Sequence, residues 1–177
     1  MSNTKRSFPI LKTKRLVLRK LINNDAQQIL YLRSNPIVNQ YILRAKQKSL
    51  PEAVSFINER NNDIENGKIF YWAISLKEEQ KLIGTICLWN FSEDKTVAEI
   101  GYDLHPDYFH KGIMTETIRE VINFGFNKLQ LESIEAFTHK ENTNSIKLLK
   151  KCSFIYQPKR VDKGFPKNNI FSLKNPN

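Results

Sequence analysis

The 177-residue sequence has only two cysteines and three histidines. Cys87 and Cys152 lie far apart and lack the paired spacing of a metal or redox site, so we expect two buried free thiols. The histidines show no ligand spacing with them, which argues against a structural or catalytic metal. No apolar run is long enough to cross a bilayer, and residues 1–10 lack the apolar centre of a secretion signal. We therefore expect a cytoplasmic protein that does not act at a membrane.

Internal repeats, low-complexity tracts and linkers are absent as well. A chain of this length can bury one full core, and 40% apolar with 26% charged residues is typical of a globular protein. We predict a single domain over residues 1–177.

Positive charge is in excess, because 28 Lys and Arg residues oppose 18 Asp and Glu residues, for a net charge of +10. Such a surface attracts polyanions at low salt. Nucleic acid, the ribosome, an acidic protein and a phosphorylated cofactor all fit it, as does a merely solubilising surface. Basic and aromatic residues do not combine into an RNA-binding signature, so we expect no direct nucleic-acid binding.

The periodicity of the apolar residues predicts strands and helices in alternation. Residues 1–11 are predicted to be a loose arm or a short edge segment, and strands are predicted over residues 15–21, 69–76, 82–91, 96–104, 133–138, 154–157 and 169–173. Helices are predicted from a cap at Asn24 to Pro36, from a capping box at Ser49 to Gly67, from Thr115 to Leu129, and from residues 142–144 to Cys152. Three consecutive strands before residue 105 indicate an antiparallel meander, and the strand, helix and strand that follow indicate a parallel crossover.

Residues 105–129 hold the strongest local pattern. Pro106 ends the preceding strand, and apolar residues after Thr115 repeat with a helical period. Between them, Gly112 lets the backbone approach a ligand, the first amides of the helix favour a phosphate, and Lys111 adds a positive charge. The same glycine could instead merely close a strand-to-helix turn. Gly125, inside the helix, indicates that the helix approaches the sheet closely.

This arrangement resembles the GNAT acyltransferase fold, in which a loop of pattern Gln/Arg-x-x-Gly-x-Gly/Ala binds the pyrophosphate of acetyl-CoA. The matching segment here reads Phe109-His110-Lys111-Gly112-Ile113-Met114. Phe109 and Met114 depart from the pattern, but such residues are familiar at these places in the RimJ/RimL branch, which acetylates ribosomal-protein N-termini. Residues 11–19, 98–102 and 141–146, with Leu149 and Phe154, resemble that branch too. Ser153 replaces a usual glycine, so the end of the last helix should be capped differently.

The resemblance implies an α/β (α+β) fold whose mixed central sheet is mostly antiparallel, with one splayed parallel strand pair and about four flanking helices. It also implies acetyl-CoA as co-substrate, and no metal. Pantetheine would lie in the splay against backbone groups of residues 102–105, and the pyrophosphate would meet the amides of residues 110–115. The implied donor-binding residues are Tyr102, Asp103, Leu104, His110, Lys111, Gly112, Ile113, Met114, Thr115 and Asn142.

Two residues match catalytic positions of the family. Glu99 matches a glutamate base, since a partly buried carboxylate with a raised pKa could take the ammonium proton directly or through water. It could also be an ordinary strand carboxylate, with ordered water as the base. Ser145 matches a hydroxyl that reaches the sulfur of CoA, or it is a helix-cap serine. Asn142 would bind the pantetheine arm or only cap a helix, and Tyr102 and Tyr108 are substitute proton donors or packing residues.

These features predict an acetyl-CoA-dependent N-acetyltransferase acting on a primary amine, either a protein N-terminus of the ribosomal-protein type or a small amine. The alternative is a non-catalytic acyl-CoA-binding module associated with the ribosome or nucleic acid. The basic segments 44–48 and 159–167 could attract an acidic acceptor or could simply be solvated. The acceptor, the acyl chain length and the oligomeric state, monomer or homodimer, stay open at this point.

Overall fold

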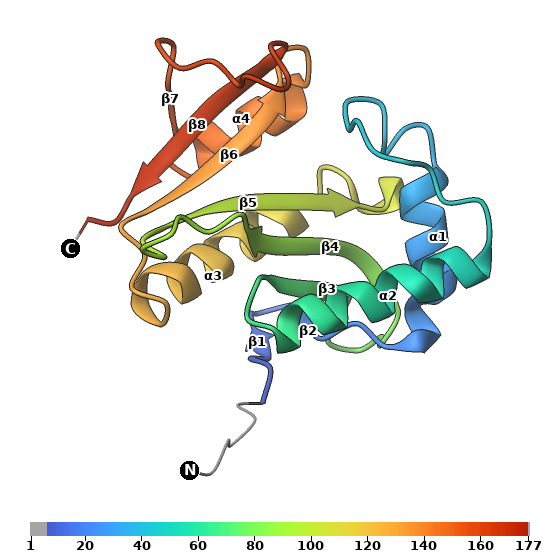
Figure 1. Ribbon diagram of the computed structural model, residues 1–177. Helices are drawn as coiled ribbons and strands as arrows, with labels where there is room; N and C mark the ends of the chain where they lie inside the picture. Colours follow the sequence, from blue (N-terminus) through green and yellow to red (C-terminus); the bar gives the residue numbers. More distant parts are fainter. Residues whose placement is uncertain (1–6, 177) are drawn as a thin grey trace.

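The computed structural model describes residues 7–176, and within them the chain forms one eight-stranded sheet of order β1-β2-β3-β4-β5-β6-β8-β7 (Figure 1). The strands are β1 (Leu11–Lys12), β2 (Leu16–Arg19), β3 (Phe70–Leu76), β4 (Leu82–Trp89), β5 (Val97–Leu104), β6 (Ser133–His139), β7 (Ile155–Tyr156) and β8 (Asn168–Lys174). The α-helices are α1 (Ala26–Ser34), α2 (Leu50–Glu65), α3 (Ile113–Asn127) and α4 (Thr143–Lys151), with short 3-10 helices at Asn23–Asp25 and Pro106–Tyr108. The predicted meander and the four flanking α-helices are confirmed for this part of the chain.

Helices α1 and α2 cover one face of the sheet, and α3 and α4 lie on the other (Figure 1). Strand β3 is apolar on both faces for this reason. Its Trp72 and Ile74 belong to the core beneath α3, whereas Ala73 belongs to a second core with Phe56 and Ile57 of α2. Both cores consist of buried aliphatic and aromatic side chains, and the removal of these side chains from water stabilises the packing of the helices on the sheet.

Strands β5 and β6 form the one parallel pair of the described sheet, and they pair over three residues only. Val97, Ala98 and Glu99 face Ser133, Ile134 and Glu135, and beyond these positions the two strands diverge while β6 stays paired with β8 as far as His139. The predicted splay is confirmed. It leaves residues 100–104 of β5 without a neighbouring strand on the β6 side.

Gly67 and Gly125 have the backbone geometry that the sequence predicts. Gly67 follows α2 with a φ of +66°, the left-handed conformation expected of a terminating glycine. Gly125 packs against the sheet, because a Cβ there would lie 3.0 Å from Ile134 Cδ1 and 3.2 Å from Leu131 Cδ1. Ser153 takes the left-handed conformation itself, with a φ of +67°, so a serine ends α4 where the family has glycine.

Some predicted boundaries and caps are wrong. Helix α1 is capped by Asp25 without a side-chain hydrogen bond, since residues 23–25 form a 3-10 turn instead of placing Asn24 as the cap. Helix α3 begins at Ile113, two residues before Thr115. The Ser49 hydroxyl accepts the Glu52 amide as predicted, but the Glu52 carboxylate accepts the amide of Lys48, so the box is not reciprocal.

The predicted strand at residues 154–157 is only β7, and that at residues 15–21 only β2. Of the predicted N-terminal arm, residues 1–6 lie outside the described chain, and β1 supplies the edge strand. Cys152 is buried as expected, Cys87 is partly exposed, and neither forms a disulfide in residues 7–176. None of the helices within these residues is long and apolar enough to cross a membrane.

Candidate active site

The loop before α3 has the backbone geometry of an anion site. His110 and Gly112 both adopt left-handed conformations, with φ values of +59° and +73°. Gly112 caps α3 without a side-chain hydrogen bond, so the first amides of the helix receive no capping acceptor. Left-handed residues that alternate with ordinary ones point successive N–H groups into a concavity, and the helix dipole adds positive potential there.

The side chains that follow Gly112 fix the direction of these amides. Ile113 and Met114 are buried in the core beneath α3, which holds the first turn against the sheet. Thr115 is partly exposed and lines a cavity at the helix start. His110 and Lys111 are exposed, and the Lys111 ammonium lies 5.5 Å from the centre of the Tyr108 ring. The structure therefore brings the six predicted loop residues, 110–115, into one turn.

Arg15 links the start of the chain to this loop. Its guanidinium donates to a Glu116 carboxylate oxygen at 2.7 Å and to the Lys111 carbonyl at 3.0 Å. The Arg15 amide, at 2.9 Å, and the Thr13 hydroxyl donate to the other Glu116 oxygen. Partial burial alone would raise the pKa of Glu116, but these hydrogen bonds and the charge of Arg15 outweigh it and lower the pKa. Glu116 is thus a paired anion, so its repulsion of a second anion at the loop is offset.

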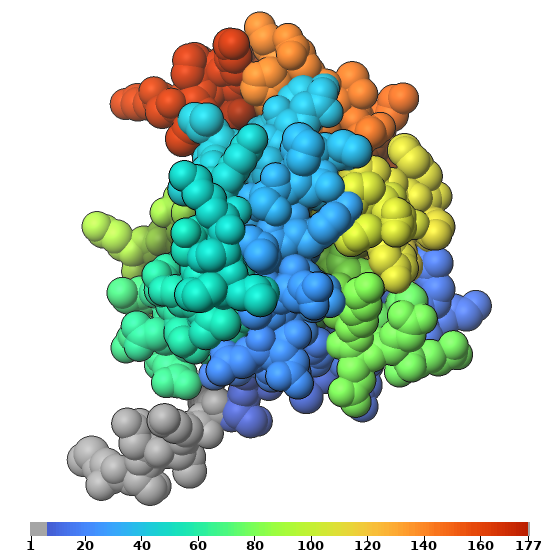
Figure 2. All heavy atoms as spheres, turned by 90° about the vertical axis from the view of Figure 1, so that its right-hand side faces the viewer, coloured from blue at the N-terminus to red at the C-terminus, as the bar shows by residue number. Residues whose placement is uncertain are grey.

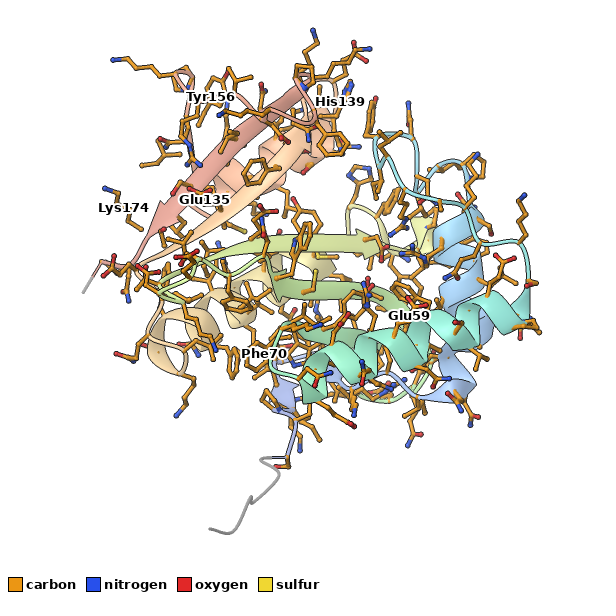
Figure 3. The ribbon with its side chains drawn as sticks, viewed as in Figure 1. Glu59, Phe70, Glu135, His139, Tyr156 and Lys174 are labelled. Atoms are coloured by element: carbon orange, nitrogen blue, oxygen red, sulfur yellow. The ribbon has the colours of Figure 1, made fainter. Side chains whose placement is uncertain are left out.

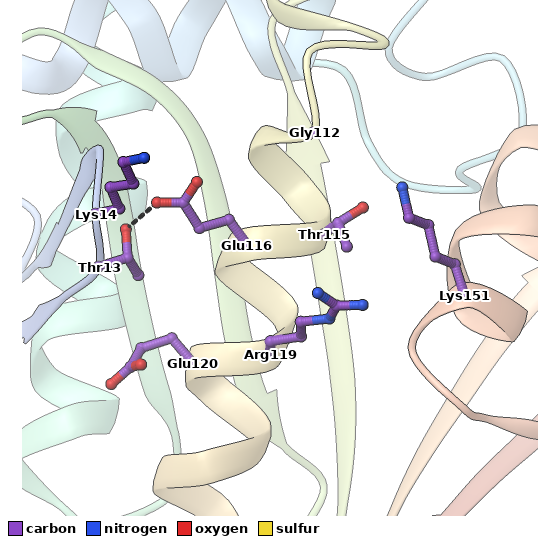
Figure 4. Close-up of a pocket in the computed structure, with 8 residues that line it drawn as sticks. All are labelled: Thr13, Lys14, Gly112, Thr115, Glu116, Arg119, Glu120 and Lys151. Atoms are coloured by element: carbon purple, nitrogen blue, oxygen red, sulfur yellow. Dashed lines mark hydrogen bonds between the residues drawn. The ribbon is translucent and has the colours of Figure 1, made fainter.

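A cavity of about 520 Å³ opens beside the first turns of α3 (Figure 4). Arg119 of α3 and Lys151 at the end of α4 approach this space from two helices, as Figure 4 shows. Its lining consists of Thr13, Lys14, Gly112, Thr115, Glu116, Arg119, Glu120 and Lys151. Three basic residues face two acidic ones, and one of the acidic residues is already paired with Arg15, so the cavity favours an anionic ligand.

Tyr102 and Ser145 meet across the splay. The Tyr102 hydroxyl of β5 and the Ser145 hydroxyl of α4 are 2.8 Å apart, and either can donate to the other. Burial raises the pKa of Tyr102 above its ordinary value, so the phenol stays protonated at neutral pH. The Ser145 amide donates at 3.1 Å to the side-chain oxygen of Asn142, which caps α4. The capping function considered for Asn142 is therefore present in this structure.

Glu99 lies where β5 and β6 part, and it is half-buried. Burial is the main cause that raises its pKa, and the charges of Glu135 and Asp162 add to it, whereas a hydrogen bond from Asn90 at 2.6 Å opposes the rise. Arg160 binds the Glu135 carboxylate with both terminal nitrogens, one of them at 2.9 Å. Figure 3 shows Glu135 on β6, the strand that forms the other side of the splay. A carboxyl group with a raised pKa beside an open gap is suited to accept a proton near neutral pH.

The remaining predicted residues differ in how they could meet a ligand. Leu104 is buried in the core beneath α3, so only its backbone faces the splay. The Asp103 side chain lies on the opposite face of the sheet, where it accepts Thr85 Oγ1 at 2.7 Å and Arg44 Nη1 at 2.9 Å. Tyr108 precedes the loop, packs against the core beneath α3 and meets the His105 ring edge-on.

Sequence reasoning missed the residues that come together only through the fold. The sequence pattern predicts only a strand position for Arg15. Arg119 and Lys151 lie on two different helices and are 32 positions apart in the sequence. A signal did exist for Arg119, because it follows Thr115 by four residues and so shares its helix face.

Within residues 7–176, no group of three or more His, Cys, Asp or Glu side chains could hold a metal ion.

Comparison with known proteins agrees with this geometry. The family model described as an acetyltransferase (GNAT) domain matches residues 15–155. Over 174 residues the chain is 31% identical to the uncharacterized N-acetyltransferase YoaA of Bacillus subtilis (strain 168), and the match covers 96% of this chain and 98% of that protein.

Solved structures share the architecture at lower identity. RimL, a ribosomal-protein alpha-N-acetyltransferase in complex with coenzyme A, superposes with a TM-score of 0.80 at 15% identity, over 94% of this chain and 98% of that one. MccE, a microcin self-immunity acetyltransferase in complex with acetyl-CoA and AMP, gives 0.78 at 20% identity, over 92% and 94%. These likenesses identify the mixed α/β fold as that of the GNAT proteins. With the family model spanning most of the sequence and a relative covering nearly all of it, the chain belongs to the GNAT family and is an acetyltransferase.

Proposed function

We propose that this protein transfers the acetyl group of acetyl-CoA to a primary amine, either a protein N-terminus of the ribosomal-protein type or a small amine. The observation that carries the proposal is the splay between β5 and β6, which begins at Glu99 and opens between the loop of residues 110–115 and the hydroxyl of Ser145. The open edge of β5 runs from Glu99, whose pKa is raised, toward the loop of residues 110–115, whose backbone conformation suits an anion, and this combination supports the proposal.

The residues present fit the donor. The amides of Gly112, Ile113, Met114 and Thr115, with His110 and Lys111, would hold its pyrophosphate, and Arg119 and Lys151 would meet further phosphate or ribose groups in the adjoining cavity. Backbone groups of Tyr102, Asp103 and Leu104 along the unpaired edge of β5 would hold the pantetheine arm, with the side-chain amide of Asn142. A solved neighbour in complex with acetyl-CoA supports this assignment.

Two groups would move protons. Glu99 would take the proton of the acceptor ammonium, directly or through a water molecule, because burial raises its pKa and so makes the carboxylate a stronger base. The Tyr102–Ser145 pair would give a proton to the departing thiolate, since the phenol stays protonated and contacts the serine at 2.8 Å. Acetyl transfer from a thioester needs both movements. The nitrogen loses a second proton when the amide forms, and that proton replaces the one that the Tyr102–Ser145 pair gave to the thiolate.

The acceptor and the cellular location form the finer part of the proposal. A fold neighbour that acetylates a ribosomal protein supports a protein N-terminus, as do the matches in residues 109–114 to the RimJ/RimL type. The neighbour solved with AMP supports a small acceptor instead. Two free thiols in the described chain suit a reducing compartment, in line with a cytoplasmic enzyme.

Calorimetry with acetyl-CoA, followed by thiol release on a panel of amines and N-terminal peptides, tests this function. We expect binding and thiol release that depends on an added amine. Binding without turnover on any acceptor would favour the alternative, a non-catalytic acyl-CoA-binding module, and absence of binding would contradict both.

A further inference from the structure

Glu99, Gly101 and Asp103 share the face of β5 that α1 and α2 cover in part. They lie opposite Trp89, Cys87 and Thr85 of β4. Gly101 and Cys87 are partly exposed although they belong to central strands, and Trp89 is 47% exposed. Gly101 and Cys87 therefore form a low floor on this face, with Glu99 at one end and Asp103 at the other. The Trp89 indole borders this floor, because its Nε1 would lie 3.7 Å from a Cβ on Gly101.

Three arginines gather at the Asp103 end of this floor. Arg44 pairs with Asp103 at 2.9 Å and also donates to Asn39 at 2.7 Å. Arg60 of α2 pairs with Asp63 at 2.9 Å. Arg33 of α1 has neither an ion pair nor a hydrogen bond among residues 7–176, and its buried Nε atom has no acceptor.

The surroundings of Arg33 destabilise its unpaired positive charge. Its guanidinium lies 4.1 Å above the Phe56 ring, and that of Arg60 lies 5.2 Å from the same ring. Burial lowers the pKa of Arg33, and the charges of Arg44 and Arg60 lower it further, against the opposing charge of Asp103. A guanidinium that is partly removed from water and repelled by two others is stabilised by an added anion.

We infer that Arg33, together with Arg44 and Arg60, binds a negatively charged group of the acceptor, so that the substrate is an amine that also carries a carboxylate or a phosphate. This inference rests on the proposed acetyl transfer, because it assigns the two ends of the same acceptor. The amine would lie toward Glu99 and the anionic group toward Arg33, across the floor formed by Gly101 and Cys87.

The length of this floor limits the acceptor. Glu99 and Asp103 are four residues apart on one strand, which corresponds to about 13 Å at the usual rise of a β-strand. An acceptor whose amine and anionic group reach toward these two ends has the length of a short peptide or a phosphorylated sugar amine. The loop between α1 and α2 borders the same region, because Tyr41 stacks on His139 with ring centres 5.5 Å apart, and Figure 2 shows this light-blue segment reaching the orange one.

A packing role for Arg33 is the competing explanation, since a cation on an aromatic ring in the last turn of a helix is stabilising in itself. The two explanations predict different effects of an Arg33 substitution on the rate of acetylation. Loss of packing would lower the rate equally for every substrate, whereas loss of an anion site would lower it only for substrates that carry the anion.

The test compares acetylation of two matched pairs of amines: triglycine against triglycinamide, and glucosamine 6-phosphate against glucosamine. Wild-type protein should prefer the anionic member of at least one pair in kcat/KM. Arg33→Gln should reduce that preference by about 10- to 100-fold, the usual weight of a charge-assisted hydrogen bond, mainly through the KM of the anionic member. Arg33→Lys should restore part of it. The pair that responds tells a carboxylate from a phosphate.

Lys128→Gln is the matched control, because it removes one positive charge from an exposed side chain at the other end of α3 from its N-terminus, and its preference should equal that of wild type. Transfer with equal rates within both pairs, or an unchanged preference in Arg33→Gln, would contradict the inference and leave the proposed function intact.

A second measurement does not depend on turnover. The NMR signal of the Arg33 Nε–H group, assigned by its loss in Arg33→Gln, should shift in a saturable way when inorganic phosphate is added in the presence of coenzyme A. Absence of a shift would overturn the inference. A saturable shift without acetylation of any amine would uphold the anion site and contradict the proposed function.

Discussion

The two faces of the sheet assemble their parts of the site in different ways. On the α3 side, the proposed grip for the donor is mostly backbone from one short segment, residues 110–115, set by the left-handed conformations of His110 and Gly112. On the α1 side, the parts are side chains from distant segments, such as Arg33, Arg44 and Asp103. A backbone grip tolerates substitution of its side chains, whereas a side-chain site changes with each substitution. The proposed donor side is thus suited to stay constant and the proposed acceptor side to vary.

Glu99→Gln should have the largest effect on activity. If Glu99 is the base, its loss should lower kcat by about 10²- to 10⁴-fold, with the KM for acetyl-CoA little changed, because the donor side is untouched. Steady-state kinetics of thiol release near neutral pH measure this. Glu78→Gln, which removes the same charge from an exposed residue between β3 and β4, should act like wild type. A wild-type rate for Glu99→Gln would assign the proton transfer to ordered water.

Asp103→Ala should chiefly affect stability. It leaves Arg44 without its partner in a mostly buried site and also removes the acceptor of Thr85 Oγ1, so the free energy of unfolding should fall by about 3–5 kcal/mol. Urea denaturation measures the change. Asp107→Ala, at a side chain that is 82% exposed, should stay within about 0.5 kcal/mol of wild type. A small loss of unfolding free energy for Asp103→Ala would mean that the Arg44–Asp103 ion pair does not stabilise the α1 side of the sheet.

Sequence reasoning succeeded where structure is local or periodic. The strands and helices follow from apolar alternation, and the loop before α3 follows from Gly112 and its neighbours, which are contiguous. The Tyr102–Ser145 contact joins residues 43 positions apart, and both residues were selected only through a family resemblance. Apolar periodicity cannot say which polar side chains meet across a splay.

The contacts on the α1 side are also hard to predict, because they join charged residues that lie far apart in the sequence. The basic segment 44–48 is predicted to face an acidic partner or solvent, yet Arg44 pairs with Asp103 across 59 positions of sequence. Arg160, in the second basic segment, likewise binds Glu135. Lone charges have no sequence period, so their partners emerge only when the strands and loops are in place. The predicted start of α1 is also wrong, because residues 23–25 form a 3-10 turn in place of the predicted cap.

Gly112→Ala should weaken the donor side alone. A side chain in the left-handed conformation costs roughly 1–2 kcal/mol, and the methyl group would stand where a phosphate should approach, so the KM for acetyl-CoA should rise about tenfold. The KM for the acceptor should not change. Gly67→Ala is a matched control, because its φ of +66° carries the same strain with nothing within 4 Å of the added Cβ. An equal change in both variants would mean that strain, and not donor binding, is responsible.

Glu135→Gln should produce the smallest change, a shift in the pH dependence of kcat/KM. Burial and the charge of Glu135 raise the pKa of Glu99, and the base works only when ionised, so activity should rise with pH through this raised pKa. Removing the negative charge of Glu135 should move the rise to lower pH. Arg160→Gln should move it to higher pH, since Glu135 then keeps its charge without its partner. If both variants show the same pH dependence of kcat/KM, the ionisation of Glu99 does not control the rate.

A crystal structure with coenzyme A would show where the donor binds. We expect the pyrophosphate to contact the amides of residues 112–115 and the pantetheine arm to lie along residues 100–104 of β5, with its sulfur near Ser145. The α1 side, with Arg33, should stay clear of the donor. A pyrophosphate bound at the Arg33 cluster, or a pantetheine arm outside the splay, would contradict the account.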